Sequence, residues 1–366
     1  MSSAGLQGRL GGRDSRPATD PWPSTFSSVL SKLVAGRYFF GSDEVAVEPV
    51  RQVDRAFSTL LHVRVRRGAS VQGAFVKIMK PRTDTAAERA STQQNVVRDF
   101  EMTRRIRQAL SGCAGLAAVR PIACFPEELA LVTEEVEGPT LSEVLARRAA
   151  GWPGRAASRE MSTLLRLAGA WLKAAQTALP EDRAMDLDAM RSYLDRRLAE
   201  LETGGLIRLT TAGRSAVERY RDRLMGELTG QNLRPVWIHA DFCPENIITG
   251  AGGITVLDFL MARSGTVYHD VAHLFMHLDA MKIKPWFRPA IVDGLQRDLL
   301  EGFEPGFETD QPLFALMRLQ HVVCHVVALQ APAQGRAARL YRAALNRRHR
   351  RWLTRVAGLD DESWTA

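Results

Sequence analysis

A carboxylate, an amide and a second carboxylate lie close together in the sequence between residues 239 and 259. Asp241 and Asn246 belong to the segment His239-Ala240-Asp241-Phe242-Cys243-Pro244-Glu245-Asn246, and Asp258 follows in Val256-Leu257-Asp258-Phe259. A carboxylate can accept the proton of a hydroxyl, and amide and carboxylate oxygens bind the magnesium on nucleotide phosphates. These residue types therefore predict magnesium-dependent phosphoryl transfer, with Asp241 as the catalytic base and Asn246 and Asp258 as metal ligands.

Short apolar runs flank these residues and predict the elements that position them. Residues 236–239, 247–249 and 254–259 have the pattern of short strands, and a glycine-rich turn joins the last two. A hairpin between Asn246 and Asp258 would bring the amide and the second carboxylate side by side. Asp241 would then lie about one loop away.

The rest of the chain predicts two lobes of different composition. Strand-like runs fill residues 48–79 and 129–136, with a helical pattern over 96–110, whereas the apolar spacing after residue 138 is mainly helical. We therefore expect an α+β protein with a nucleotide-binding N-lobe at 25–137 and a catalytic and acceptor-binding C-lobe at 138–366. Residues 1–24 lack periodic apolar positions and are expected to be a disordered leader.

The segment around Asp241, Asn246 and Asp258 resembles the catalytic and metal-binding loops of the aminoglycoside phosphotransferase and choline kinase family, relatives of protein kinases. The run Tyr268-His269-Asp270-Val271-Ala272 is similar to the segment that follows the metal-binding aspartate in that family. The resemblance implies a bilobal protein-kinase-like fold with a small antiparallel sheet in the N-lobe. It also implies that Asp270 is a buried acid that organises the catalytic loop, with His239 as a structural support.

Lys77 lies inside an apolar strand and is similar to the family's lysine that reaches the ATP phosphates. Its carboxylate partner should lie on the following helix. Asp99 shares the apolar face of that helix with Thr103 and Ile106, whereas Glu101 projects about 140° away at roughly 100° per residue. Asp99 is the expected partner, and Glu101, the residue type usual in the family, stays the alternative.

Two further segments resemble the nucleotide-binding parts of the family. Residues 131–138 are similar to its hinge, where adenine would bond backbone groups around Glu134 and Val136. Residues 52–58 stand where protein kinases have a glycine-rich loop but lack its glycines, and Ser58 could donate a hydrogen bond to a phosphate or simply stabilise a turn. The implied cofactors are ATP and Mg²⁺, and the implied acceptor is a hydroxyl of an aminoglycoside, an amino alcohol or a sugar.

Two other functions compete with this interpretation. A protein kinase would have a lysine between the catalytic aspartate and the asparagine, a DFG motif and a long activation segment. This chain has Cys243 and Leu260 at the diagnostic positions, and only a short segment joins Asp258 to Asp270. A catalytically silent, ligand-binding regulator is the second alternative, and an assay of transfer with magnesium would distinguish it.

Composition limits the partners and the location. No uninterrupted apolar stretch is long enough for a membrane helix and no signal peptide is recognisable, so we expect a cytoplasmic protein without membrane insertion. Four scattered cysteines predict reduced thiols.

The net charge of +8 is spread over the chain, and the arginine-rich stretch 336–355 is interpreted as a solvated helix face rather than a nucleic-acid site. His321 and His325, four residues apart, are expected to be core histidines rather than metal ligands.

Overall fold

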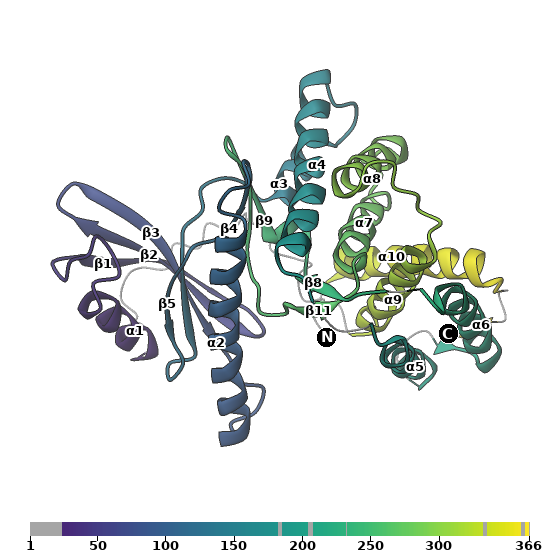
Figure 1. Cartoon of the computed structure of the whole chain (residues 1–366), viewed down its shortest axis with the longest axis horizontal. Helices are drawn as coiled ribbons and strands as arrows, with labels where there is room; N and C mark the ends of the chain where they lie inside the picture. Colours follow the sequence, from purple (N-terminus) through teal and green to yellow (C-terminus); the bar gives the residue numbers. More distant parts are fainter. Residues whose placement is uncertain are drawn as a thin grey trace. The chain divides into compact units, whose positions relative to one another are not determined.

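The structure, a computed structural model, describes residues 24–181, 185–203, 208–231, 233–331, 335–359 and 363–365. The leader expected at residues 1–24 lies, up to residue 23, outside this range. The described chain folds as two compact units (Figure 1). Among the described residues, the first comprises 24–138 together with Gly250–Ala262, and the second comprises Pro139–Thr249 and the chain from Arg263 onward. Residues 250–262, expected in the C-lobe, thus group with the first unit.

The first unit contains a five-stranded antiparallel sheet with the strand order β1-β2-β3-β6-β5. Two helices and the strands β4 and β10, which pair in parallel outside this sheet, complete it. The elements of this unit are α1 (Ser24–Ala35), β1 (Ala46–Asp54), β2 (Ser58–Arg67), β3 (Ser70–Met79), α2 (Ala86–Ala109), β4 (Leu116–Ala118), β5 (Pro121–Phe125), β6 (Ala130–Glu134) and β10 (Gly253–Val256).

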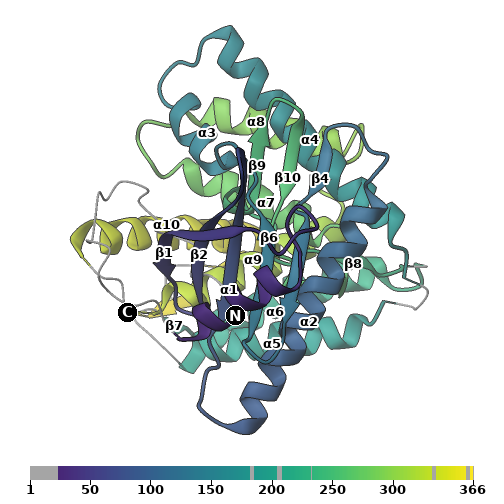
Figure 2. The same ribbon diagram turned by 90° about the vertical axis from the view of Figure 1, so that its left-hand side faces the viewer.

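The two helices of this unit cover opposite faces of the sheet (Figure 2). Alternate residues of a strand point to opposite faces, so Val76 of β3 packs in the cluster that includes α1. Met79 packs instead with Val96 of α2. Lys77, two residues before Met79, therefore points to the face that α2 covers.

The pairing of β4 with β10 brings residues 250–262 into the first unit. The two strands run parallel, with Ile254 opposite Leu116. Gly253 has a φ of +127°, and a Cβ there would lie 2.1 Å from the carbonyl oxygen of Gly115. Only glycine fits this close approach of two backbones, so the start of β10 depends on it.

The second unit is mainly helical. A short antiparallel pair of β8 with β11 is its most relevant sheet, because β8 leads into the segment that carries Asp241. The elements are α3 (Leu141–Arg148), α4 (Arg155–Ala178), α5 (Leu187–Thr203), β7 (Arg208–Leu209), α6 (Thr211–Leu228), β8 (Val236–Ile238), η1 (Pro244–Asn246), β9 (Ile247–Gly250), β11 (Arg263–Gly265), α7 (His269–Met281), α8 (Pro289–Phe303), α9 (Pro312–Leu329), α10 (Arg336–Ala357) and β12 (Trp364–Thr365). The α+β class expected from the sequence is confirmed.

Helix α9 is the central helix of the second unit and contacts α5, α6, α7 and α10 (Figure 1). By length and composition it could cross a membrane, and it is the one such helix found in the part of the chain that the structure describes. Most of its surface is buried against the surrounding helices. A core helix passes the same test, so α9 carries no argument for a membrane.

Candidate functional site

Lys77 lies between two carboxylates in the first unit. It projects from β3, and its Nζ is 2.8 Å from Oδ1 of Asp258 and 3.6 Å from Oδ2 of Asp99. Asp99 comes from α2 and is 1% exposed, whereas the Asp258 side chain is 36% exposed. The three residues are distant in sequence, and β3, α2 and the loop after β10 bring them together.

The charges of this triad depend on one another. Burial favours neutral Lys77, but the carboxylates of Asp258 and Asp99 outweigh it and raise the pKa of the lysine. Burial raises the pKa of Asp99 to about 6, opposed by Lys77 and reinforced by the charge of Asp258. The Oδ2 atom of Asp99 is buried and accepts no hydrogen bond. The lysine is therefore cationic, and Asp99 is held by an ion pair that lacks close hydrogen-bonding geometry.

Glu101, the alternative partner, lies elsewhere on α2. Its carboxylate contacts the guanidinium of Arg104 at 2.7 Å, and both side chains are exposed. The helical-face argument thus agrees with the structure, which places Asp99 and not Glu101 beside Lys77.

The loop between β1 and β2 is fastened by a lysine that the sequence interpretation did not assign. The Nζ of Lys80 donates to Oδ1 of Asp54 at 3.2 Å and to the carbonyl of Arg55 at 3.0 Å. Its backbone N–H donates to the carbonyl of Phe57. Ser58 follows as the buried first residue of β2. The only sequence feature that could have indicated this contact is that Lys80 directly follows the strand of Lys77. The same position is equally typical of an exposed residue at a strand edge.

The expected hinge begins at the end of β6. The carboxylate of Glu134 receives bonds from Arg107 of α2 at 3.0 Å and from Arg120 at 3.1 Å. Its backbone N–H donates to the carbonyl of Arg120. Val136 lies in the non-helical segment that follows. The Glu134 side chain therefore ties the strand to α2, and its amide is already bonded within the protein.

Asp270, in the first turn of α7, binds the backbone of the segment that carries Asp241. Its two carboxylate oxygens accept the backbone N–H groups of His239 at 2.6 Å and of Ala240 at 2.9 Å. Ala240 has a φ of +64°, which is unfavourable for a residue with a Cβ. The two buried hydrogen bonds offset this strain and fix the turn that presents Asp241.

Asp241 and Asn246 lie at the two ends of one loop. The Nδ2 of Asn246 donates to the carbonyl of Asp241 at 2.9 Å and to its Oδ2 at 3.2 Å. The backbone N–H of Asp241 donates to Nδ1 of His239 at 3.3 Å, so His239 acts as an acceptor inside the loop. Pro244 begins the short η1 turn that returns the chain to Asn246. The loop thus holds a carboxylate and an amide within hydrogen-bonding distance.

Aromatic rings pack against this loop. The ring of Phe242 is buried and stacks on Trp171 of α4, with centroids 5.6 Å apart, and His239 meets the same phenyl ring edge-on. Burial works to raise the pKa of Asp270, but hydrogen bonds and charge from His269 and His239 outweigh it, so the pKa lies below its usual value. Asp270 is therefore an ionised, satisfied acid.

Asp258 and Asn246, the two expected metal ligands, belong to different units. Asp258 follows β10 with a φ of +64°, between a partly buried Leu257 and the buried ring of Phe259. Within the residues described, no group of three or more His, Cys, Asp or Glu side chains forms a ready-made metal cluster. Both side chains offer hard oxygen atoms, the type that Mg²⁺ selects when it also binds phosphates.

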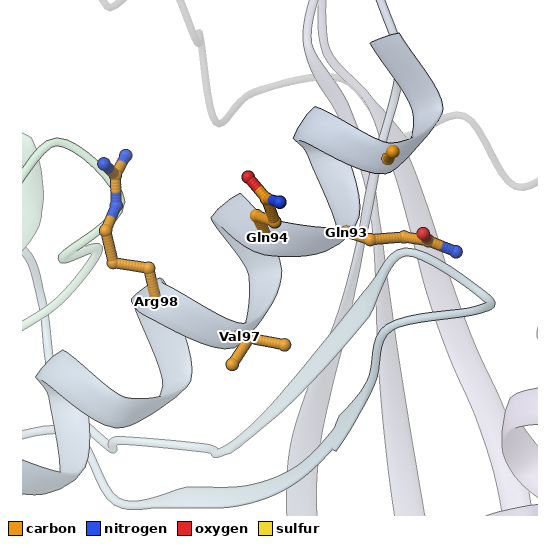
Figure 3. Close-up of a pocket in the computed structure, with 5 residues that line it drawn as sticks. Gln93, Gln94, Val97 and Arg98 are labelled. Carbon is orange, nitrogen blue, oxygen red and sulfur yellow. The ribbon is translucent and has the colours of Figure 1, made fainter. Parts of the chain in front are cut away.

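A shallow hollow of about 400 Å³ lies on α2, and Lys77 is not among its lining residues (Figure 3). Its lining residues come from one face of that single helix: Ala90, Gln93, Gln94, Val97 and Arg98. Arg98 extends from it toward the carbonyl of Leu260. Ligand sites usually collect polar groups from several elements around an enclosed volume. This open hollow does not, and it carries none of the expected site residues.

The model of the phosphotransferase enzyme family matches residues 62–313. This range includes every site residue named from the sequence except Ser58. No curated protein matches the chain.

Three solved structures with the same fold are of small-molecule kinases. The streptomycin–ATP–APH(2″)-IIa ternary complex aligns with a TM-score of 0.55 and 12% identity, covering 90% of this chain and 97% of that chain. Aminoglycoside phosphotransferase APH(4)-Ia, with AMP-PNP and hygromycin B, has a TM-score of 0.55 and 15% identity over 90% and 98%. Choline kinase LicA from Streptococcus pneumoniae aligns with a TM-score of 0.51 and 15% identity, covering 91% of this chain and 100% of that chain.

Proposed function

Because the chain belongs to the phosphotransferase enzyme family, we propose that it transfers the γ-phosphate of ATP to a hydroxyl of a small molecule. The observation that carries the proposal is the loop of Asp241 and Asn246, whose backbone is held by the buried carboxylate of Asp270. A strained turn fixed in this way is typical of a site that must present one side chain to a reacting group.

Each polar residue of the two regions has a part in this proposal. Asp241 accepts the proton of the acceptor hydroxyl, and Asn246 holds that carboxylate in place. Asn246 and Asp258 would hold Mg²⁺, which offsets the negative charge of the phosphates when bound.

Nucleotide binding would rest on the first unit. Lys77, fixed by Asp99, would pair with the phosphates, and Ser58 would donate to them from the start of β2. Backbone groups around Glu134 and Val136 would bind adenine. Because the amide of Glu134 already donates to Arg120, its carbonyl and the amide of Val136 are the groups we assign to the base. A cytoplasmic location, with ATP at hand, belongs to the same proposal.

The acceptor is proposed to be a small molecule rather than a protein. Only β11 and short loops separate Asp258 from α7, which leaves no room for the long activation segment on which protein kinases bind peptides. Complexes of the structural relatives contain streptomycin or hygromycin B, and another relative is a choline kinase. Aminoglycosides, amino alcohols and sugars are therefore the acceptor classes to test.

The decisive experiment is a panel of such acceptors incubated with ATP and MgCl₂, with ADP formation and phosphorylated product both measured. Asp241→Asn is the matched blank, because it keeps the side-chain volume and removes the base. We expect product with at least one acceptor class, and product reduced about 100-fold or more in the blank. ATP binding without product for any acceptor would instead favour a silent, ligand-binding regulator.

A further inference from the structure

Six of the eight histidines of the protein lie in the second unit on three helices that pack together (Figure 1). Helix α7 carries His269, His273 and His277 at intervals of four residues, α9 carries His321 and His325, and α10 carries His349. At intervals of four, side chains share one helix face. The sequence interpretation singled out the α9 pair and missed the row on α7.

The first half of this histidine chain connects α7 to α9. The Nε2 of His321 donates to the backbone carbonyl of His269 at 2.8 Å, and their rings lie 4.5 Å apart. The ring of His321 also stacks on His273, with centroids 4.7 Å apart and planes inclined by 15°.

The second half continues to α10. The Nε2 atoms of His273 and His277 are 3.2 Å apart, and the ring of His277 stacks on that of His325 at 6.5 Å. The Nε2 of His349 is 3.0 Å from Nδ1 of His325. Contacts thus run without interruption through all six imidazoles. Each of the two nitrogen–nitrogen pairs needs one ring to donate and the other to accept, so at least one ring of each pair must be neutral.

The chain ends at the carboxylate that holds the catalytic loop. The Nδ1 of His269 is 3.1 Å from Oδ1 of Asp270, and Asp270 accepts the backbone N–H groups of His239 and Ala240. A displacement of the first turn of α7 would therefore move the backbone beside Asp241.

The surroundings strongly favour neutral rings. Burial, reinforced by the other histidines, lowers the pKa of His273 and of His321 well below the usual range. Burial also lowers the pKa of His277 to about 4, and those of His325 and His349 to about 3.

The charged groups that act on the histidine chain are two cations and two carboxylates that are already paired. They are Asp270 and Asp279 on α7 and Arg342 and Arg348 on α10. The carboxylate of Asp279 is neutralised by Arg348 and Lys282 at 2.6 and 2.9 Å. Both carboxylates are therefore already engaged, Asp279 by these two cations and Asp270 by backbone N–H groups, and an added proton on the histidine chain finds no unpaired carboxylate among these groups.

We propose that the histidine chain is a positioning network that braces α7 while it is neutral, and that acid opens it and releases the catalytic loop before the two units unfold. When protons occupy both members of a nitrogen–nitrogen pair, both become donors and the pair separates. The inference rests on the proposed function for its meaning, since positioning matters only if Asp241 reacts, but its test does not require activity.

The size of the effect follows from linkage. A histidine that is neutral when closed and has its usual pKa near 6.5 when open favours opening by about 30-fold at pH 5, because that pH is about 1.5 units below 6.5. The sign is that of a lowered pKa: the closed state is fully stable above pH 6.5 and loses stability as the pH falls toward the lowered values. Two histidines exposed together would favour opening at pH 5 by about 1,000-fold.

The test is amide hydrogen exchange of the full chain between pH 7.5 and 5.0, corrected for intrinsic rates. We expect the amides of His239 and Ala240 to lose about 30-fold or more of their protection at pH 5, while β2 and β3 stay protected. In the variant His277→Leu/His325→Leu, which removes two proton acceptors and one ring of each nitrogen–nitrogen pair, the loss of protection at pH 5 should be clearly smaller than in the wild type. His62→Gln, a histidine of β2 outside the chain, is the matched control and should open like the wild type.

Three results would overturn the proposal. They are full protection of the loop amides at pH 5, simultaneous loss of protection in both units, and opening of the double variant at the same pH as the wild type. If the double variant fails to fold, the loss of amide protection at pH 5 in the single variant His325→Leu, compared with that of the wild type, tests the proposal instead. Once an acceptor is known, the rate of transfer should fall with decreasing pH more steeply than the protonation of Asp241 alone would cause. Loop opening in a chain without transfer activity would reject the proposed function and leave the network intact.

Discussion

The two regions of the molecule each contain a fully buried aspartate next to the expected chemistry, and the two are stabilised in opposite ways. Asp270 accepts two backbone N–H groups and a bond from His269, and its pKa is lowered despite burial. Asp99 has one oxygen without a hydrogen bond and faces Lys77 at 3.6 Å, and burial raises its pKa to about 6. A buried carboxylate is stable where donors surround it, and costs free energy where a single cation at long range must suffice.

This difference matches what each region would have to do. The loop of Asp241 must be fixed before the substrate arrives, and satisfied backbone bonds provide that rigidity. Lys77 would have to exchange the contact with Asp258 for contacts with nucleotide phosphates. A partner at 3.6 Å holds the ammonium in place without competing strongly for it.

The largest expected effect is the loss of the base that Asp270 positions. Asp241→Asn should reduce phosphoryl transfer by about 10² to 10⁴-fold, since that is the usual contribution of general-base catalysis. ATP binding, measured by calorimetry, should stay within about threefold of the wild type because Lys77 and Asp258 are unchanged. Activity within threefold of the wild type would remove Asp241 from the mechanism.

Asp258→Ala should abolish magnesium-dependent ATP binding, because it removes the carboxylate that we assign to both the metal and the phosphates. Isothermal titration with ATP in the presence and absence of MgCl₂ measures this directly. Asn246→Ala should weaken metal use less, since an amide oxygen is a poorer ligand. Unchanged affinity for Mg-ATP in the Asp258 variant would contradict the proposed metal role.

The two buried aspartates should respond to the same isosteric change with opposite signs. Asp270→Asn leaves one of the two backbone N–H groups without its acceptor, so the free energy of unfolding should fall by about 1–3 kcal/mol. Asp99→Asn removes a poorly compensated buried charge and should leave stability at pH 7.5 unchanged or raised by about 1–2 kcal/mol. Urea denaturation of both variants checks this, and equal losses would break the comparison.

The pH dependence gives the same contrast. Asp99 has a pKa raised above its value of about 3.8 in the unfolded chain, so its ionisation destabilises the fold above pH 6 and this cost disappears as the pH falls through 6 toward 4. The histidines act in the other direction below pH 6.5. Subtracting the pH profile of Asp99→Asn from that of the wild type should isolate a contribution that decreases with pH between 4 and 7.

The sequence was most informative where chemistry and periodicity coincide. Residue types and spacing predicted the loop of Asp241 and Asn246, and helical-face arithmetic indicated Asp99 rather than Glu101, as the distances show. It could not predict β4, because a three-residue strand that pairs with residues far along the chain has no local signal.

The sequence also did not predict the contacts of Lys80 and of the histidine chain. Lys80 has the pattern of any exposed lysine at a strand end, and its bonds to Asp54 and Arg55 depend on how the loop folds back. The histidine chain joins helices separated by long stretches of sequence, so single-helix spacing shows the rows but not their contact.

The lysine pair gives a smaller and more specific effect. Lys77→Ala should raise the apparent ATP constant and lower turnover together, because the ammonium would bind the phosphates in the ground state and more tightly in the transition state. Lys80→Ala should have a weaker effect through the β1–β2 loop that it fastens. Lys32→Ala, which removes a surface lysine paired with Glu128, is the control and should change neither parameter.

The smallest effect distinguishes the two acidic residues of α2. Glu101→Ala removes an exposed ion pair with Arg104, so it should change stability by less than about 0.5 kcal/mol and leave ATP use at the wild-type level. Asp99→Ala should resemble a milder loss of Lys77, because the lysine would keep its contact with Asp258 but lose the buried group that aims it. Steady-state kinetics over a range of ATP concentrations, with both variants at matched stability, measures the difference. If Glu101→Ala is the more damaging of the two for ATP use, the carboxylate that positions Lys77 during turnover is Glu101, and α2 must rotate when nucleotide binds.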